Sequence, residues 1–224
     1  MAEEIKMKVI ARIRSDFPTK FGIPRQSGLV EGLKSTIVFE PEYRDKNALR
    51  GIEQFSHLWL VWQFSEAARE DWSPTVRPPR LGGNTRMGVF ATRSPFRPNS
   101  IGMSCVRLEK IDCEKGILYV SGTDMCDGTP VYDIKPYLSF ADSVPNAVSG
   151  FADEKKDYEI EVIIPDGLRE KLPAEKLEGL IGALRDDPRP AYKRNDDKEY
   201  GFTYAGKEIK FISGEGVLTV TDII

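Results

Sequence analysis

Residues 52–64 read IEQFSHLWLVWQF, a run of aromatic and β-branched residues that suits a buried strand better than a helix. Little of residues 1–150 has the period of an amphipathic helix, so the sequence predicts an all-β barrel or sandwich for this part of the chain. Further strands, each bounded by turn residues, are predicted at residues 8–13, 33–39, 87–92, 102–111 and 117–123.

The composition changes after residue 150. A mixed charge run, DEKKDYE at residues 153–159, precedes a predicted strand at 160–164 and a short amphipathic helix at 175–184. Short strands are predicted at residues 202–204, 208–212 and 217–221. The chain is therefore predicted to be mainly β, with a barrel domain over residues 1–150 and a small α+β C-terminal domain over residues 151–224.

Composition and motifs exclude several classes of protein. The longest apolar run, at residues 58–62, falls far short of the ~18 residues of a spanning helix, and the N-terminus lacks a signal-peptide apolar region. We therefore expect a cytoplasmic protein with no membrane partner. No GxGxxG motif opens a helix and no phosphate-loop motif is present, so a Rossmann cofactor site is not predicted.

The residues that could hold a metal are few. Cys105, Cys113 and Cys126 lack CxxC spacing, and the sequence has 1 histidine, His57. We expect no metal, and we expect the cysteines to be small buried apolar residues. His57 is expected to be packed or hydrogen-bonded, with a role as catalytic base as the alternative.

Positive charge gathers in residues 73–108, although the formal net charge of the chain is −3. This stretch contains 6 arginines and no Asp or Glu, and it is rich in Gly, Pro, Asn and Thr. Planar guanidinium groups can bind phosphates or carboxylates through two parallel hydrogen bonds. The stretch is therefore predicted to be a ligand-binding surface.

Three acidic residues, Asp124, Asp127 and Asp133, lie in the segment DMCDGTPVYDIKPY at residues 124–137, and the last two stand out from the solvated majority of acids. DGTP is a turn signal, and the remainder is an extended stretch. Asp127 can form an Asx-type turn and Asp133 can form a surface ion pair with Lys135, or both can belong to a functional site. Composition alone leaves these alternatives open.

The segment GVFATRSPFRPN, at residues 88–99, resembles the signature of the TrmO family of S-adenosylmethionine-dependent tRNA methyltransferases, in older usage VirR-like proteins. The resemblance covers most of residues 5–150. Flanking words that also fit are FGIPRQ (21–26), FSHLW (55–59), RPPR (77–80), DGTP (127–130), DIKPY (133–137) and DPRPAY (187–192).

The resemblance implies an antiparallel β-barrel cofactor domain and a homodimer. It also implies that S-adenosylmethionine donates a methyl group to N6 of the threonylcarbamoyl-modified adenosine 3′ of the anticodon of threonine tRNA. Ser65 stands where a close relative can carry His, which favours a backbone role there. By matching position, the cofactor contacts would be Ser15, Asp16, Phe17, Phe64, Ser65, Arg93, Met103, Asp124, Met125, Cys126 and Asp127.

The chemistry of the cofactor suggests roles for these residues. Its carboxylate needs an arginine or backbone N–H groups, which predicts Arg93; its ammonium needs an acid, which predicts Asp124 or Asp127. Its adenine needs an apolar slot, which predicts Phe17 with Met103. Methyl transfer also releases a proton from N6, and Asp127 or Asp133 is the predicted catalytic base.

The remaining basic residues are predicted to contact phosphates of the anticodon loop, whose unpaired bases can be splayed out for recognition. Pairing with some of the 35 carboxylates is the alternative. A non-catalytic regulator that binds S-adenosylmethionine and RNA, and a methyltransferase acting on another RNA or a small molecule, remain alternative functions. The predicted RNA contacts are Arg25, Arg77, Arg80, Arg86, Arg97, Arg189 and Lys193.

Overall fold

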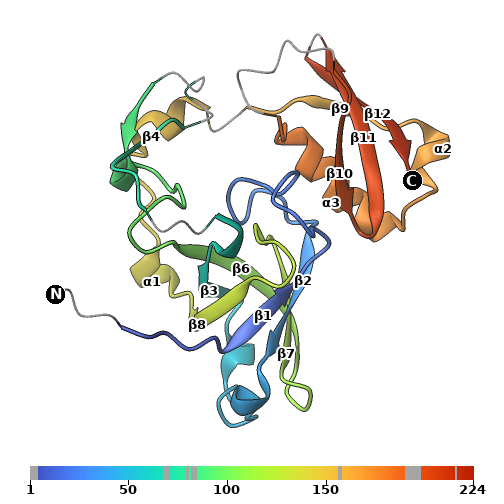
Figure 1. Cartoon of the computed structure of the whole chain (residues 1–224). Helices are drawn as coiled ribbons and strands as arrows, with labels where there is room; N and C mark the ends of the chain where they lie inside the picture. The colour runs from blue at the N-terminus through green and yellow to red at the C-terminus, as the bar shows by residue number, and fades with distance from the viewer. Residues whose placement is uncertain are drawn as a thin grey trace.

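The computed structural model is mainly β (Figure 1). Two larger sheets account for most of the strands, and short helices lie in the connections between them. The structure describes residues 5–67, 71–78, 81, 85–155, 158–189, 198–214 and 216–224.

The first sheet is a closed antiparallel barrel with the strand order β1-β2-β7-β6-β3-β8. Pairing of Ala11 with Val131 and of Arg12 with Pro130 joins β1 to β8 and closes it. Closure removes the unpaired edges that an open sheet would present. The predicted barrel is confirmed. Its strands are β1 (Ala11–Arg14), β2 (Lys34–Phe39), β3 (His57–Gln63), β6 (Ile101–Asp112), β7 (Ile117–Ser121) and β8 (Pro130–Pro136).

Strand β3 supplies the barrel core through strict alternation. Leu58, Leu60 and Trp62 are buried, and the residues between them are partly exposed. The strand predicted at residues 52–64 is correct only from His57 onward. Gly51 takes a left-handed conformation (φ 90°) and starts a 3-10 turn, η2 (Ile52–Gln54), which delays the strand.

The strand predicted at residues 87–92 is largely wrong. β5 covers Met87–Gly88 and pairs with β4 (Thr75–Val76), after which the chain turns into the 3-10 helix η5 (Val89–Ala91). The carbonyl oxygen of Val89 accepts hydrogen bonds from the Thr92 hydroxyl and the Arg97 guanidinium, and these contacts favour the turn.

The extended stretch of the DGTPVYDIKPY segment forms β8, between β1 and β3. Prolines occupy its first and last positions, where the missing N–H does least harm to a ladder. Other short segments are η1 (Pro41–Tyr43), η3 (Ser65–Ala67), α1 (Ser139–Asp142) and η6 (Gly150–Lys155).

The C-terminal sheet has the order β10-β11-β12-β9, with β9 parallel to β12 and the other pairs antiparallel. The buried face of α3 packs against this sheet and contributes Leu180, Ala183 and Leu184 to its core. The α+β class predicted for this region is confirmed. Its elements are β9 (Glu161–Ile163), α2 (Asp166–Arg169), α3 (Ala174–Arg185), β10 (Tyr200–Tyr204), β11 (Lys207–Gly214) and β12 (Val217–Ile223).

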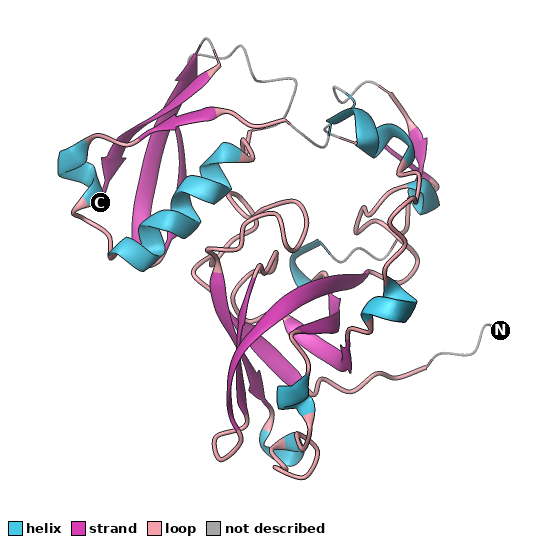
Figure 2. Cartoon of the chain, turned by 180° about the vertical axis from the view of Figure 1, so that it is seen from behind, coloured by secondary structure: helices cyan, strands magenta, loops and turns pink. Residues whose placement is uncertain are grey.

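A loop of the N-terminal region, residues 15–33, lies beside α3 (Figures 1 and 2). Phe17, Val30 and Leu33 from this loop belong to the hydrophobic core of the C-terminal sheet. Val30 touches the helix where Gly182 leaves space, since a Cβ there would lie 2.3 Å from Val30 Cγ1. The loop therefore joins the two cores.

Polar contacts fix the same loop. The Lys176 ammonium pairs with Asp16 at 2.5 Å, and the backbone N–H of Ala205 donates to the Asp16 carbonyl. The guanidinium of Arg25 donates to the carbonyl oxygen of Asp187. Within the described residues, none of the helices is long and apolar enough to cross a membrane.

Replacing Phe17 tests the joined core. Its side chain is 3% exposed and packs on Phe202 and Tyr204, so Phe17→Ala should lower the free energy of unfolding by about 3–5 kcal/mol. Urea unfolding of the full chain measures this change. Phe140→Ala, at a site that is 86% exposed, is the matched control and should be neutral. A loss below about 1 kcal/mol for Phe17→Ala would mean that the loop does not share the C-terminal core.

Candidate functional site

The predicted cofactor segments meet at one end of the barrel. β1 and β3 each pair antiparallel with β8, and β3 pairs antiparallel with β6. The C-terminal ends of β1 and β3 therefore lie at the same end as the beginnings of β6 and β8. Residues 15–17, 64–65, 103 and 124–127 all flank these ends, so the structure brings together positions that are far apart in the sequence.

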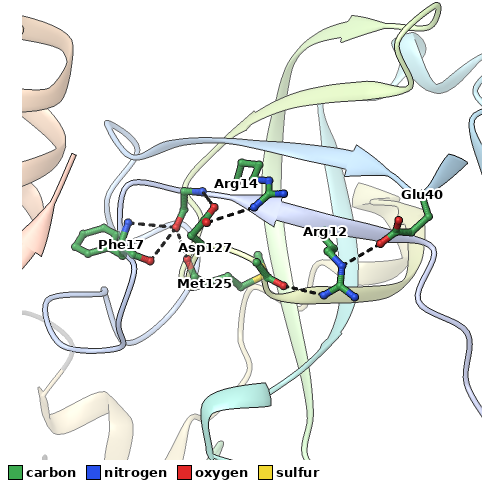
Figure 3. Close-up of polar contacts among 8 residues, drawn as sticks. Arg12, Arg14, Phe17, Glu40, Met125 and Asp127 are labelled. Atoms are coloured by element: carbon green, nitrogen blue, oxygen red, sulfur yellow. Dashed lines mark hydrogen bonds and ion pairs between the residues drawn. The ribbon is translucent and has the colours of Figure 1, made fainter. Parts of the chain in front are cut away.

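Two loops at this end, the one after β1 and the one before β8, are joined by hydrogen bonds (Figure 3). The backbone N–H of Ser15 donates to the Asp127 carboxylate at 3.2 Å, and the Ser15 hydroxyl donates to the Met125 carbonyl at 2.9 Å. The backbone N–H of Asp127 in turn donates to the Phe17 carbonyl at 2.8 Å. Gly128, at φ 78°, allows the tight turn in which Thr129 bonds back to Cys126.

A chain of polar contacts runs from the barrel core to Asp124. The Trp62 indole N–H donates to the Ser104 hydroxyl at 2.9 Å, and that hydroxyl donates to the Asp124 carboxylate at 2.6 Å. Burial raises the pKa of Asp124, while hydrogen bonds from Ser104 and the Ser27 backbone and the charge of Arg93 act in the opposite direction. A partly desolvated carboxylate is thus held in one orientation.

Arg93 adds a positive charge in the neighbourhood of this carboxylate. Its exposed guanidinium donates to the side-chain carbonyl of Gln26, and its charge is felt at Asp124. An acid and a guanidinium in the same region of the surface are complementary to the ammonium and carboxylate of an amino acid group. The two side chains fit the roles predicted for them at the amino acid end of S-adenosylmethionine.

Apolar side chains are also found at this end of the barrel. Met103 directly precedes Ser104 on β6 and is 56% exposed, whereas Met125 is buried in the barrel core. The Phe64 ring packs on Trp62 at 4.3 Å between centroids, and Ser65 is exposed at the start of η3. Met103 therefore offers accessible apolar surface at this end of the barrel.

The thiol of Cys126 is not poised as a nucleophile. Burial raises the pKa of Cys126 to about 11, and the negative charge of Glu66 adds to the shift. The thiol therefore stays protonated at neutral pH. The three cysteines differ from the prediction of buried apolar residues, because Cys105 and Cys126 are half-buried and Cys113 is exposed.

Phe17 and Asp16 take positions that the sequence did not suggest. The Phe17 ring faces the C-terminal core, so the predicted apolar slot of Phe17 with Met103 does not form in this structure, and only the Phe17 backbone faces the joined loops. The Asp16 carboxylate is held by Lys176 from α3. Both residues connect this end of the barrel to the C-terminal sheet.

The two candidate bases lie in different settings. Asp127 sits in the joined loops, where its carboxylate also pairs with Arg14 at 3.4 Å (Figure 3). Asp133 lies within β8, where its carboxylate pairs with Lys135 at 2.7 Å and accepts the Ile134 N–H. The ion-pair alternative for Asp133 is confirmed, and Asp127 binds Ser15 rather than forming an Asx turn with its own neighbours.

Three of the predicted RNA contacts are engaged inside the molecule. Arg189 is 2% exposed and pairs with the Asp187 carboxylate at 2.9 Å. Arg25 binds backbone carbonyls of the same segment, and Arg97 binds those of Val89 and Thr92. An RNA contact by Arg189 would therefore require its guanidinium to leave a buried ion pair.

The other predicted RNA contacts are at the surface or outside the described residues. Arg77 and Arg86 are exposed around the β4–β5 pair, and the guanidinium of Arg86 donates to the Thr75 hydroxyl. Arg80 and Lys193 lie outside the described residues. The basic stretch thus contains both structural and accessible arginines.

The residues that support this site carry little signal in the sequence. Ser104 and Trp62 orient Asp124, Gln26 holds Arg93, and Lys176 holds Asp16. One signal was available: Ser104 is a hydroxyl at an inward position of a strand whose other inward residues are apolar or glycine. Gln26 and Lys176 carried no comparable signal, because their partners lie far away in the sequence.

The structure also shows the surroundings of His57 and of the side chains that could bind a metal. His57 Nδ1 forms a hydrogen bond with the Ser56 hydroxyl at 2.9 Å, and its ring packs edge-on against Tyr137, so the expectation of a packed, hydrogen-bonded histidine is confirmed. His57 begins β3, at the opposite end of that strand from Phe64 and Ser65. Among the described residues, no group of three His, Cys, Asp or Glu side chains could hold a metal ion.

Comparisons with known proteins agree with this arrangement. A family model described as the tRNA-methyltransferase O N-terminal domain matches residues 12–143, and one described as the TrmO C-terminal domain matches residues 157–224. The tRNA (adenine(37)-N6)-methyltransferase of Escherichia coli (strain K12) is 46% identical over 204 residues, 88% of this chain and 86% of the relative. A putative S-adenosylmethionine-dependent methyltransferase, RcsF, of Pseudomonas aeruginosa is 43% identical over 201 residues, 86% of this chain and 85% of the relative.

The fold is shared over the whole length. A crystal structure of TrmO from Pseudomonas aeruginosa matches with a TM-score of 0.78 at 33% identity and covers 99% of this chain and 100% of that chain. The resemblance found in the motifs is therefore confirmed across both sheets. This chain belongs to the TrmO family of tRNA methyltransferases.

Proposed function

We propose that this protein transfers a methyl group from S-adenosylmethionine to N6 of the threonylcarbamoyl-modified adenosine at position 37 of threonine tRNA. The general activity, S-adenosylmethionine-dependent methylation of tRNA at adenine N6, follows from the family and from the similarity to the Escherichia coli enzyme. The identity of the modified base and the choice of threonine tRNA are supported by the motif resemblance. The observation that carries the proposal is the placement of Arg93 and Asp124 at the end of the barrel where the loops meet.

The residues present at this end fit the cofactor. Asp124 would accept hydrogen bonds from its ammonium, Arg93 would bind its carboxylate, and Met103 would cover apolar parts of the molecule. When bound, S-adenosylmethionine supplies a methyl group made electrophilic by the positive sulfur. The protein has to hold that methyl group in line with N6 of the adenosine and keep water away.

Transfer of the methyl group to N6 leaves one proton to be removed from that nitrogen. Asp127 supports this role better than Asp133, because it lies in the loops joined to Ser15 and Phe17. One oxygen of the Asp127 carboxylate accepts from the Arg14 guanidinium and the other from the Ser15 N–H, and each oxygen has a second lone pair that can take up a proton. We therefore propose Asp127 as the base and Asp133 as a strand residue paired with Lys135.

We also propose that the protein acts as a homodimer with the domains at residues 1–150 and 151–224. The motif resemblance supports the dimer, and the two sheets with their separate strand ladders support the division. Light scattering of the purified chain measures the mass directly. A monomeric mass at working concentration would refute the dimer.

The proposed reaction is tested by mass spectrometry of nucleosides. Threonine tRNA carrying the threonylcarbamoyl modification is incubated with the purified protein and S-adenosylmethionine, then digested. A mass gain of one methyl group on that nucleoside is expected. A methylated adenosine lacking the threonylcarbamoyl group would overturn the substrate, and binding of both ligands without any methylation would favour the regulatory alternative.

Asp124→Asn should weaken cofactor binding while making the protein more stable at neutral pH. Because folding raises the pKa of Asp124, the ionised carboxylate costs stability above that pKa, and the cost vanishes as the pH falls below the unfolded value of about 3.9. The variant should therefore melt at or above the wild-type temperature at pH 7–8, with the difference shrinking toward pH 4. Losing a charged partner should reduce S-adenosylmethionine affinity by about tenfold or more in calorimetry.

The matched control is Asp112→Asn, which removes the same charge at the opposite end of β6. The pKa of Asp112 is lowered, chiefly by the hydrogen bond from the Lys115 backbone, so this control should not gain stability at neutral pH. Its cofactor affinity should be unchanged. Equal affinities for the Asp124 variant and the wild type would remove Asp124 from the cofactor site.

The two candidate bases are separated by single-turnover kinetics. Asp127→Asn should slow methyl transfer by about 10²-fold or more, since general bases contribute about 10²–10⁴ to the rate. Asp133→Asn should change the rate by less than about threefold. Cofactor and tRNA affinities of both variants are measured alongside. If Asp133→Asn slowed methyl transfer more than Asp127→Asn did, Asp133 would be the base. If both variants were fully active, the proton would be removed by solvent.

A further inference from the structure

Two large aromatic rings stack on each other at the protein surface, outside both hydrophobic cores. Trp72 is 48% exposed and Phe90 is 69% exposed, and their ring centroids lie 6.1 Å apart at an interplanar angle of 26°. Single exposed apolar residues are ordinary, whereas neighbouring ones that form a patch rimmed by polar residues mark interaction sites. We call Trp72 and Phe90 the aromatic pair.

The surrounding backbone holds the aromatic pair in place. The N–H of Val89 donates to the Pro74 carbonyl at 3.0 Å, and the N–H of Ser73 donates to the Phe96 carbonyl at 3.1 Å. These bonds fix the residue next to each ring, which is Ser73 beside Trp72 and Val89 beside Phe90. Strands β4 and β5, between the two rings in sequence, pair with each other as well.

Arg97 adds a cation beside the rings. Its guanidinium carbon lies 5.5 Å from the centroid of the Phe90 ring, while its N–H groups bind the carbonyls of Val89 and Thr92. The internal hydrogen bonds of Arg97 therefore fix a positive charge over one aromatic face. Stacked rings with a bound guanidinium are a surface on which nucleic acid bases stack.

The charge of the region favours an anionic partner. Residues 73–108 contain no Asp or Glu, and the exposed Arg77 and Arg86 flank β4 and β5. Asp71, which precedes Trp72, is the nearest described acid on the N-terminal side of the stretch. Figure 1 shows β4 beyond the end of the barrel formed by β3, β6 and β8, and Figure 2 shows the same arrangement from behind.

The aromatic pair is also close to the cofactor site. Phe90 and Arg93 are three residues apart, so their Cα atoms are separated by at most about 11 Å. A base held at the aromatic pair would therefore lie near the adenosine that receives the methyl group of the cofactor held by Arg93 and Asp124.

We propose that the aromatic pair is a stacking platform for an unpaired base of the tRNA anticodon loop, one that neighbours the methylated adenosine. The inference rests on the proposed function, because it assigns a second contact to the same RNA. Stacking is tolerant of base identity, so the platform would position the loop, and hydrogen bonds elsewhere would select the sequence. Phosphates next to the stacked base would reach Arg77 and Arg86.

The fluorescence of Trp72 reports stacking directly. Of the 3 tryptophans, Trp62 is buried, Trp59 is partly buried, and Trp72 is the most exposed. Titration with a threonine tRNA anticodon stem-loop should quench the emission of the wild-type protein. In Trp72→Phe most of this quenching should disappear while affinity stays within about threefold, because phenylalanine still stacks. Unchanged quenching in Trp72→Phe would overturn the proposal.

Affinity measurements provide the second readout. Trp72→Ala and Phe90→Ala should each weaken binding of threonine tRNA by about 5- to 150-fold, the range found for loss of one base–aromatic stack. Their salt dependence should match that of the wild type, since no charge is lost. Arg86→Ala should instead flatten the log–log salt slope by about 0.7–0.9. Phe140→Ala, an exposed aromatic outside the stretch, is the control and should bind normally.

The outcomes separate this proposal from the proposed function. Wild-type protein that methylates the tRNA, with normal RNA affinity in both alanine variants, would refute the platform alone. A shift in molecular mass for Trp72→Ala or Phe90→Ala, with RNA affinity unchanged, would make the pair a contact between protein chains and would also refute it. If an alanine variant fails to fold, the quenching measured with Trp72→Phe decides the question.

Discussion

The pairing of β1 with β8 is the constraint on which the rest of this structure depends. It closes the barrel, and its hydrogen bonds continue past the strands, from Ile13 to the Thr129 carbonyl and from Gly128 to the Ile13 carbonyl. Because the ladder runs on in this way, the residues after β1 must lie against the residues before β8. The site is therefore a consequence of closure, and its two main loops cannot separate without opening the barrel.

The C-terminal sheet takes part in the same arrangement. Phe17 fills a position in the core of that sheet, and Asp16 is held by Lys176 and by the backbone of Ala205. The side chains of one short loop thus serve the C-terminal core while its backbone binds the loop before β8. Phe17 therefore connects the core beneath α3 to the loop before β8, because its carbonyl accepts the N–H of Asp127.

The arginines of the basic stretch at residues 73–108 have two kinds of role, one inside the fold and one at the surface. Arg97 binds backbone carbonyls and shapes the turn that follows β5, whereas Arg77, Arg86 and Arg93 stay exposed. Guanidinium groups suit both uses, because they are always charged and carry five donors in a rigid plane. An acid-free stretch therefore does not make every arginine in it a ligand contact, and the buried pair of Arg189 with Asp187 illustrates the same point in the C-terminal region.

The sequence by itself determined the barrel class, most strands, helix α3 and the family, because strand composition, turn residues and the GVFATRSPFRPN motif are local signals. It also named Arg93 and Asp124. Only the tertiary structure decided that Phe17 faces the C-terminal core, that Ser104 and Trp62 orient Asp124, and that Trp72 stacks on Phe90. Each of these depends on contacts between residues far apart in the chain, which closure of the barrel and packing of α3 create and which no local pattern encodes.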